Sequence, residues 1–177
     1  MKILKTLLLS LTLMLMMVSC KKKETVANTY EGCCGNVPLS GQIGNVKFNI
    51  ANVYTPNGDG YNDMISISAG SDIGKVTDFI VKDKNNVEVF RGSSTFNGAN
   101  YDILMTNTEN AKVPEGLLNY TFKITPSTGS ATQFQGSICK NTSKGTDCPA
   151  TNSKCLFSSQ NDRGTFNRSL PSNEACK

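Results

Sequence analysis

The amino-acid sequence predicts an all-β fold, an antiparallel β-sandwich followed by a loop-rich extension that disulfides hold in place. Three observations predict it. Apolar residues alternate with polar ones in several short runs, turn-forming residues separate these runs, and no stretch has the 3.6-residue apolar spacing of an amphipathic helix. Alternation with a period of two buries one face of a strand and leaves the other in water, as in antiparallel sheets.

The predicted strands follow one another from about residue 46 to residue 138. Their alternating apolar side chains are Val46, Phe48 and Ile50, then Ile65 and Ile67, Val87 and Val89, Leu118, Tyr120, Phe122 and Ile124, and finally Phe134 and Ile138. The run Val76–Asp83 is apolar enough for a central strand. Turn formers separate the runs at Pro56–Gly60, Lys84–Asn86, Asn97–Gly98 and Pro126–Gly129.

The first twenty residues indicate a bacterial lipoprotein signal. A basic start, Met1–Lys5, precedes the apolar run Leu7–Val18, which is shorter than the ~20 residues of a membrane span but suits a cleaved signal. The run ends in Met-Val-Ser-Cys and resembles a lipobox with Met17 in place of leucine. The resemblance implies cleavage before Cys20 and lipidation of its thiol. An uncleaved anchor, the alternative, would also leave the domain outside the cytoplasm.

This signal divides the chain into a signal peptide (1–19), a tether (20–32), a β-sandwich domain (33–140) and a cysteine-rich extension (141–177). We therefore expect an outer-membrane, lipid-anchored protein whose first partner is the bilayer, with the membrane face left open. The basic residues Lys21–Lys23 lie either beside anionic headgroups or on a solvated tether. The net charge of +4 and the lack of a basic patch interleaved with aromatics argue against a nucleic-acid partner.

Of the seven cysteines, the six after Cys20 form an even set that favours disulfides in an oxidising compartment. They are Cys33, Cys34, Cys139, Cys148, Cys155 and Cys176. Zinc is the rival interpretation, but the chain has no histidine and no C-x-x-C pair. Adjacent cysteines bond each other only with strain, so we expect Cys33 and Cys34 to reach different partners near the C-terminus. Disulfides would then hold the polar extension on the sandwich; a disordered tail is the alternative.

The segment Tyr54–Asp63 is the most distinctive local pattern, since it combines proline, two glycines and several side-chain oxygens. Hard oxygen ligands suit Ca²⁺, and the candidate calcium ligands are Asn57, Asp59, Tyr61 through its carbonyl, Asn62 and Asp63. The segment is not an EF-hand loop, because the position of the final glutamate falls on Ser66. A tight turn whose side chains bond its own backbone is the alternative, so calcium is only a possible cofactor.

The same segment resembles the opening S/T-P-N-G-D-G-x-N-D of the gliding-motility-associated C-terminal domain, the type B sorting domain of type IX secretion. Weaker motifs follow in the order of that family at Phe79–Lys84, Val87–Phe90, Asn97–Asp102 and Pro114–Tyr120. The resemblance covers about residues 46 to 138 and implies an immunoglobulin-like sandwich from the Bacteroidetes. Because the domain here follows a lipid anchor and precedes a cysteine-rich segment, we expect a stand-alone lipoprotein domain and not a secretion signal.

The sequence predicts a protein that is not an enzyme. It has no histidine, no G-x-S-x-G elbow and no P-loop. We expect an interaction or accessory subunit of an envelope assembly for secretion, gliding or nutrient uptake, with a partner protein docked at an exposed sheet edge. The alternative is a carbohydrate-binding surface lipoprotein. Because the chain has no tryptophan, sugar stacking would use Tyr101 or Tyr120, although we expect Tyr120 in the core.

Overall fold

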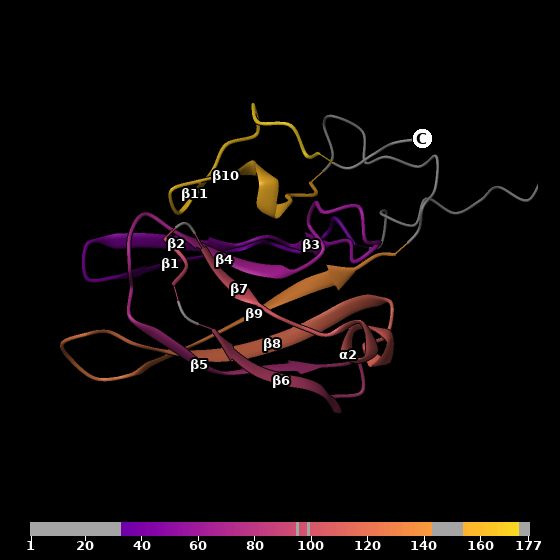
Figure 1. Ribbon diagram of the computed structural model, residues 1–177, viewed down its shortest axis with the longest axis horizontal. Helices are drawn as coiled ribbons and strands as arrows, with labels where there is room; N and C mark the ends of the chain where they lie inside the picture. The colour runs from indigo at the N-terminus through magenta and orange to yellow at the C-terminus, as the bar shows by residue number, and fades with distance from the viewer. Residues whose placement is uncertain (1–32, 95, 99, 143–153, 174–177) are drawn as a thin grey trace, which may run out of the picture.

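The computed structural model describes residues 33–94, 96–98, 100–142 and 154–173. Within these ranges two sheets pack face to face (Figure 1). The first sheet has the order β1 (Leu39–Ile43), β2 (Val46–Ile50), β4 (Ile65–Ala69) and β7 (Asn100–Ile103). The second has the order β3 (Val53–Tyr54), β9 (Thr132–Lys140), β8 (Gly116–Thr125), β5 (Lys75–Lys82) and β6 (Glu88–Ser94). All neighbours are antiparallel except β3 and β9, so the predicted all-β fold with antiparallel sheets is confirmed.

The core lies between the two sheets and follows the alternation in the sequence. On β8 the side chains of Leu118, Tyr120, Phe122 and Ile124 are buried, while the residues between them face outward. The ring of Phe122 stacks on Phe79 of the same sheet at 5.6 Å and meets Phe48 of the opposite sheet edge-on at 6.3 Å. Such aromatic pairs add about 0.5–1.5 kcal/mol beyond burial. Tyr120 therefore belongs to the core, as predicted.

The helix α2 (Asn107–Lys112) shows that the prediction of no helix is wrong. Residue Thr106 and residue Glu109 form a capping box, in which each side chain bonds the backbone N–H of the other. The helix buries none of its residues, so it leaves no apolar periodicity in the sequence. The T-x-x-E pattern is the sequence signal that identifies it.

Strands β1, β3 and β7 also lie outside the predicted set. Residues 97–102, expected as a turn, form a turn only as far as Asn100, where β7 begins. The β7 strand is short, but it pairs with β4 from Ile65 to Ser68 and buries Tyr101 and Ile103 completely. Tertiary pairing thus makes a strand from four residues whose local pattern indicates a turn.

The described part of the extension, residues 154–173, lies on the outer face of the first sheet (Figure 1). It contains the 3₁₀ turn η1 (Ser158–Gln160) and a hairpin of β10 (Asn161–Asp162) and β11 (Thr165–Phe166). Gly164, with φ of +79°, lies so close to the main chain of Lys47 that a side chain would not fit. Asn49 and Ser68 of the sheet's outer face are 0% and 4% exposed. A disordered tail is therefore wrong for these residues.

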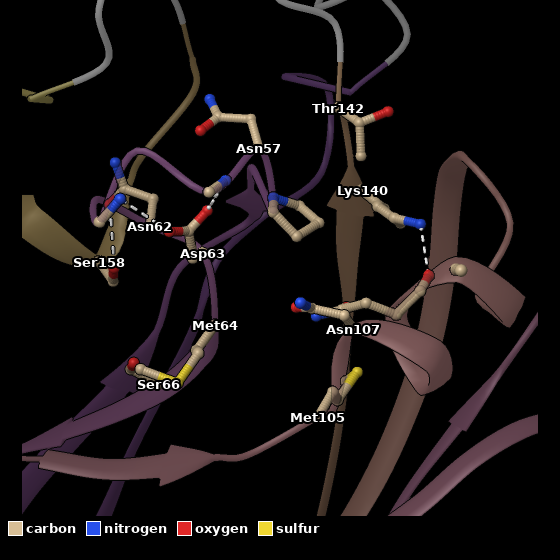
Figure 2. A pocket seen from close by; sticks show the side chains of 15 residues that line it. Asn57, Asn62, Asp63, Met64, Ser66, Met105, Asn107, Lys140, Thr142 and Ser158 are labelled. Carbon is tan, nitrogen blue, oxygen red and sulfur yellow. Dashed lines mark hydrogen bonds between the residues drawn. The ribbon is translucent and has the colours of Figure 1, made fainter.

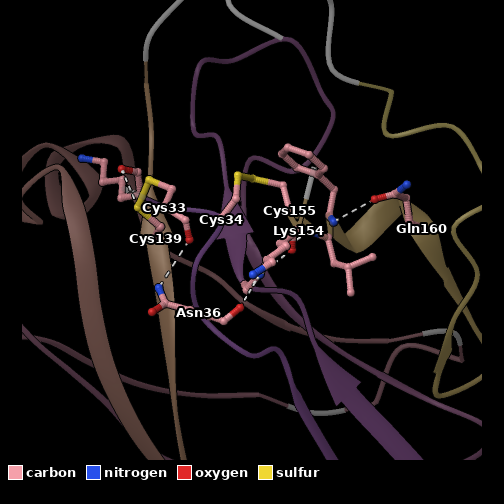
Figure 3. The surroundings of a disulfide bond; sticks show 11 residues. Cys33, Cys34, Asn36, Cys139, Lys154, Cys155 and Gln160 are labelled. Atoms are coloured by element: carbon pink, nitrogen blue, oxygen red, sulfur yellow. Dashed lines mark hydrogen bonds between the residues drawn. A yellow bond between two sulfur atoms is a disulfide. The ribbon is translucent and has the colours of Figure 1, made fainter. Parts of the chain in front are cut away.

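Two disulfides join the start of the described chain to its end (Figure 3). Cys33 bonds Cys139 and Cys34 bonds Cys155, across 106 and 121 residues of sequence respectively. This confirms that the two adjacent cysteines have different partners. The signal peptide, Cys20, the tether, Cys148 and Cys176 lie outside the described residues. In the described part of the chain, no helix has both the length and the apolar composition to cross a membrane.

Candidate functional site

The 57–63 loop, residues Asn57 to Asp63, is folded around its own side chains. The two carboxylate oxygens of Asp63 accept hydrogen bonds from the N–H groups of Gly58 and Gly60, each at 2.8 Å. Both glycines have positive φ, at +80° and +90°, which side-chain-bearing residues rarely adopt. Asn57 accepts from the N–H of Asp59, and Asp59 from that of Tyr61, both at 2.9 Å. These consecutive bonds two residues apart are Asx turns.

Asn62 is the exception in this loop, because its side chain points toward the extension. Its Oδ1 accepts hydrogen bonds from the Ser158 hydroxyl at 2.9 Å and from the Ser159 N–H at 3.1 Å. Its Nδ2 donates to the carbonyl of Ser172 at 2.9 Å. Asn62 is 7% exposed and adopts φ of +50°, a conformation that asparagine tolerates better than most residues. The loop and the extension are thus joined through one amide.

The five predicted calcium ligands do not converge on one point. The Asp63 oxygens face the loop's own N–H groups, whereas the Asn62 oxygen faces the extension. Among the residues that the structure describes, no group of three or more Asp, Glu, His or Cys side chains could hold a metal ion. Of the two interpretations of this loop, the geometry favours the self-bonded turn. The calcium interpretation stays a prediction without support from this arrangement.

An open cleft of about 770 Å³ lies between the 57–63 loop and helix α2 (Figure 2). We call it the loop–helix cleft. Asn57 and Asp63 lie on its loop side, and Asn107 lies on its helix side. The side chains of Met64 and Met105 lie between these two sides. Its volume falls within the range of known ligand sites, about 300–1,000 Å³.

Lys140 closes the cleft at the end of β9 and also stabilises helix α2. Its side chain is almost fully buried, and its Nζ donates to the carbonyls of Asn110 and Val113, each at 2.7 Å. The same atom pairs with Glu115 at 3.6 Å. The last carbonyls of a helix have no partner within the helix, so Lys140 supplies one from a distant strand. Sequence reasoning missed this residue, because nothing local to Lys140 indicates its contact with the helix.

Three side-chain amides line the cleft with unused hydrogen-bonding capacity. Among the described residues, the Asn107 side chain and the Asn57 Nδ2 have no hydrogen-bond partner, and the Asn110 Oδ1 is buried without one. An amide carries two donor hydrogens and an acceptor oxygen. The cleft therefore offers uncharged donors and acceptors from both of its sides.

An exposed apolar rim adjoins the cleft. Tyr61 is 50% exposed, Met64 37% and Leu104 71%. Met64 and Leu104 are the residues next to the last pair of the β4–β7 ladder, Ile65 with Ile103. Exposed Met and Tyr side chains are enriched in protein interfaces. The tyrosines proposed for sugar stacking are wrong, since Tyr101 and Tyr120 are 0% and 1% exposed.

Two ionisable groups beside the cleft have shifted pKa values with clear causes. Burial, and secondly the negative charge of Glu115, raise the pKa of Tyr54, so its hydroxyl stays protonated. The N–H of Thr106, followed by its hydroxyl, lowers the pKa of Glu109, which keeps the capping box charged. Both effects hold structure in place and neither makes a reactive group. A comparison of the chain with protein-family models, with curated proteins and with solved structures finds no match.

Proposed function

We propose that this chain is a lipid-anchored, non-catalytic interaction module of the outer membrane, an accessory subunit of an envelope assembly for secretion, gliding or nutrient uptake. The observation that carries the proposal is the loop–helix cleft with its exposed rim of Tyr61, Met64 and Leu104. A cavity with uncharged polar sides next to exposed apolar residues suits the recognition of a protein surface.

Both sides of the cleft are held in shape before any partner binds. Asp63 bonds the loop internally, Lys140 bonds the end of α2, and Asn62 bonds the loop to the extension. The disulfide Cys34–Cys155 fixes the start of the described extension. A surface that is already ordered loses little conformational entropy on binding, which favours affinity. This supports a binding role for the cleft.

The strand order supports an immunoglobulin-like classification of the sandwich. In the second sheet, β8 lies between β9 and β5, and β6 follows β5 at the edge. This is the G-F-C-C′ order of a variable-type immunoglobulin sheet, and β4 between β2 and β7 then corresponds to strand B between A and E. The parallel pairing of β3 with β9 fits the same scheme. The proposal therefore keeps the resemblance to the sorting-domain family as its structural background.

The sheet edge at β6 is a weaker docking place than the cleft. Glu88 and Arg91 form a bidentate ion pair on this edge, with N–O distances of 3.0 and 2.7 Å. Charged side chains on an edge strand discourage pairing with another strand. The original expectation of a partner strand at an exposed edge is therefore replaced, in this proposal, by a partner in the cleft.

A carbohydrate-binding surface lipoprotein remains the second candidate function. The amides of Asn57, Asn107 and Asn110 favour it, because side-chain amides also bind sugar hydroxyls. Neither function depends on a titrating group in the cleft.

The test is crosslinking and pull-down from native membranes with the full lipidated protein. The key variant is Ala111→Trp, which places a large ring in the cleft from the exposed face of α2. The matched control is Ala131→Trp in the exposed turn before β9, about 30 Å away along that strand. We expect a stoichiometric envelope protein with the wild type and the control, and its loss with Ala111→Trp. Recovery of no specific partner, or unacylated protein in the cytosol, contradicts the proposal.

A further inference from the structure

We infer that the loop–helix cleft binds an uncharged, extended peptide segment of the partner protein, with one apolar side chain on the two methionines. The inference rests on the proposed function and adds the chemical class of the ligand. It follows from the charges, the amides and the apolar residues of the cleft.

The charged groups lining the cleft have partners within the protein. Asp63 accepts from two backbone N–H groups, at 2.8 Å each. Lys140 uses its three donor positions on two helix carbonyls and on Glu115. A charged ligand would lose its hydration without gaining a free counter-charge, which costs free energy. The cleft therefore selects a neutral ligand.

The unused amides match a peptide backbone. Asn57 lies on the loop side, whereas Asn107 and Asn110 lie on the helix side. A side-chain amide presents a donor and an acceptor in one plane, as a main-chain peptide group does. An extended strand placed between the two sides can exchange hydrogen bonds with both. Recognition through the main chain leaves the partner's polar side chains unspecified.

The apolar residues favour a peptide over a sugar. Met64 and Met105 lie between the polar sides, and the lining contains no aromatic residue. A pyranose ring typically packs its apolar face on an aromatic ring. Methionine is flexible and polarisable, and it adapts to apolar side chains of different shapes. Tyr61 and Leu104 extend the apolar contact beyond the cleft. A leucine- or methionine-sized side chain thus fits better than a sugar.

The experiment selects displayed random peptides of about nine residues on the mature, disulfide-bonded chain. We expect the enriched peptides to be uncharged, with at least one Leu, Ile, Met or Phe. Ala111→Trp is expected to weaken binding of these peptides about tenfold or more, whereas Ala131→Trp leaves it unchanged. Met105→Lys places a charge between the polar sides and is expected to shift selection toward acidic peptides. Circular dichroism and melting temperature establish that each variant is folded.

Three results overturn the inference. These are enrichment of charged peptides by the wild type, peptide binding that Ala111→Trp leaves intact, and the absence of any enriched peptide. A parallel array of neutral oligosaccharides identifies the carbohydrate alternative if its signal is lost with Ala111→Trp. If no peptide binds but the membrane pull-down recovers a partner that Ala111→Trp loses, the peptide inference fails while the proposed function stands.

Discussion

The side-chain amide of Asn62 donates a hydrogen bond to the main-chain carbonyl of Ser172, 2.9 Å away and 110 residues later in the sequence. The oxygen of the same amide accepts from Ser158 and Ser159, so all three bonds reach the extension. A residue that the sequence proposes as a calcium ligand therefore holds the C-terminal part of the chain against the sandwich.

Asn62→Ala is expected to loosen the extension. The substitution leaves the Ser159 N–H and the Ser172 carbonyl without this partner, at a cost of about 1–3 kcal/mol. Hydrogen exchange measures the effect, and we expect faster exchange across residues 158–173 with unchanged protection of β8. Asn119→Ala is the matched control, because its one hydrogen bond, to Ser137, is exposed. Equal protection of the extension in wild type and Asn62→Ala would show that the amide does not hold it.

Removing the disulfide Cys34–Cys155 by double substitution to serine is expected to lower the free energy of unfolding by about 2–5 kcal/mol. The loop it closes spans 121 residues, so its loss increases the entropy of the unfolded chain considerably. Urea denaturation measures the change.

Peptide mapping without reduction checks the pairing itself. We expect fragments that join Cys33 to Cys139 and Cys34 to Cys155. The prediction that all six cysteines are oxidised then leaves Cys148 and Cys176 to each other. Six alkylatable thiols, or fragments that join Cys33 to Cys155, would contradict this pairing.

Acid is expected to weaken the contact between Asp72 and Tyr101. The Tyr101 hydroxyl, followed by the Gly74 N–H, lowers the pKa of Asp72, so the folded state favours its carboxylate. Its stabilisation is complete above the unfolded pKa of about 3.9 and is lost as the pH falls through the lower folded value. The destabilisation caused by Asp72→Asn should therefore shrink between about pH 7 and pH 2.

Urea denaturation at a series of pH values measures this difference. Asp162→Asn, at an exposed position of the extension, is the control and should change little across the series. A destabilisation by Asp72→Asn that is constant with pH would refute the assignment. Tyr101→Phe removes the donor to Asp72 and the acceptor of the Ile73 N–H, and should cost about 1–3 kcal/mol at neutral pH.

Asp63→Ala is expected to destabilise the 57–63 loop whether or not calcium is present. It removes both acceptors for the N–H groups of Gly58 and Gly60, at about 0.5–1.5 kcal/mol for each bond. Thermal melts with chelator and with added calcium should be the same for the wild type. A rise in melting temperature with calcium, absent in Asp63→Ala, would restore the metal interpretation.

Local patterns were sufficient for the strands of the core. Val46 to Ile50 and Leu118 to Ile124 alternate between apolar and polar residues, and their inner and outer faces follow directly. The capping pair Thr106 and Glu109 carried the information for α2, although apolar spacing alone missed it. Short strands such as β3 and β7 could not be predicted in this way, since their partners lie elsewhere in the chain.

By itself the sequence determined the all-β class, the inner face of each main strand, and that adjacent cysteines bond different partners. These properties depend on residue order within a few positions or on covalent geometry. Tertiary structure alone decided that Lys140 bonds the end of α2, that Asn62 faces the extension, and that Asn57 lies across a cleft from Asn107. Each of these depends on how strands distant in sequence pair, because pairing sets which loops meet at one end of the sandwich.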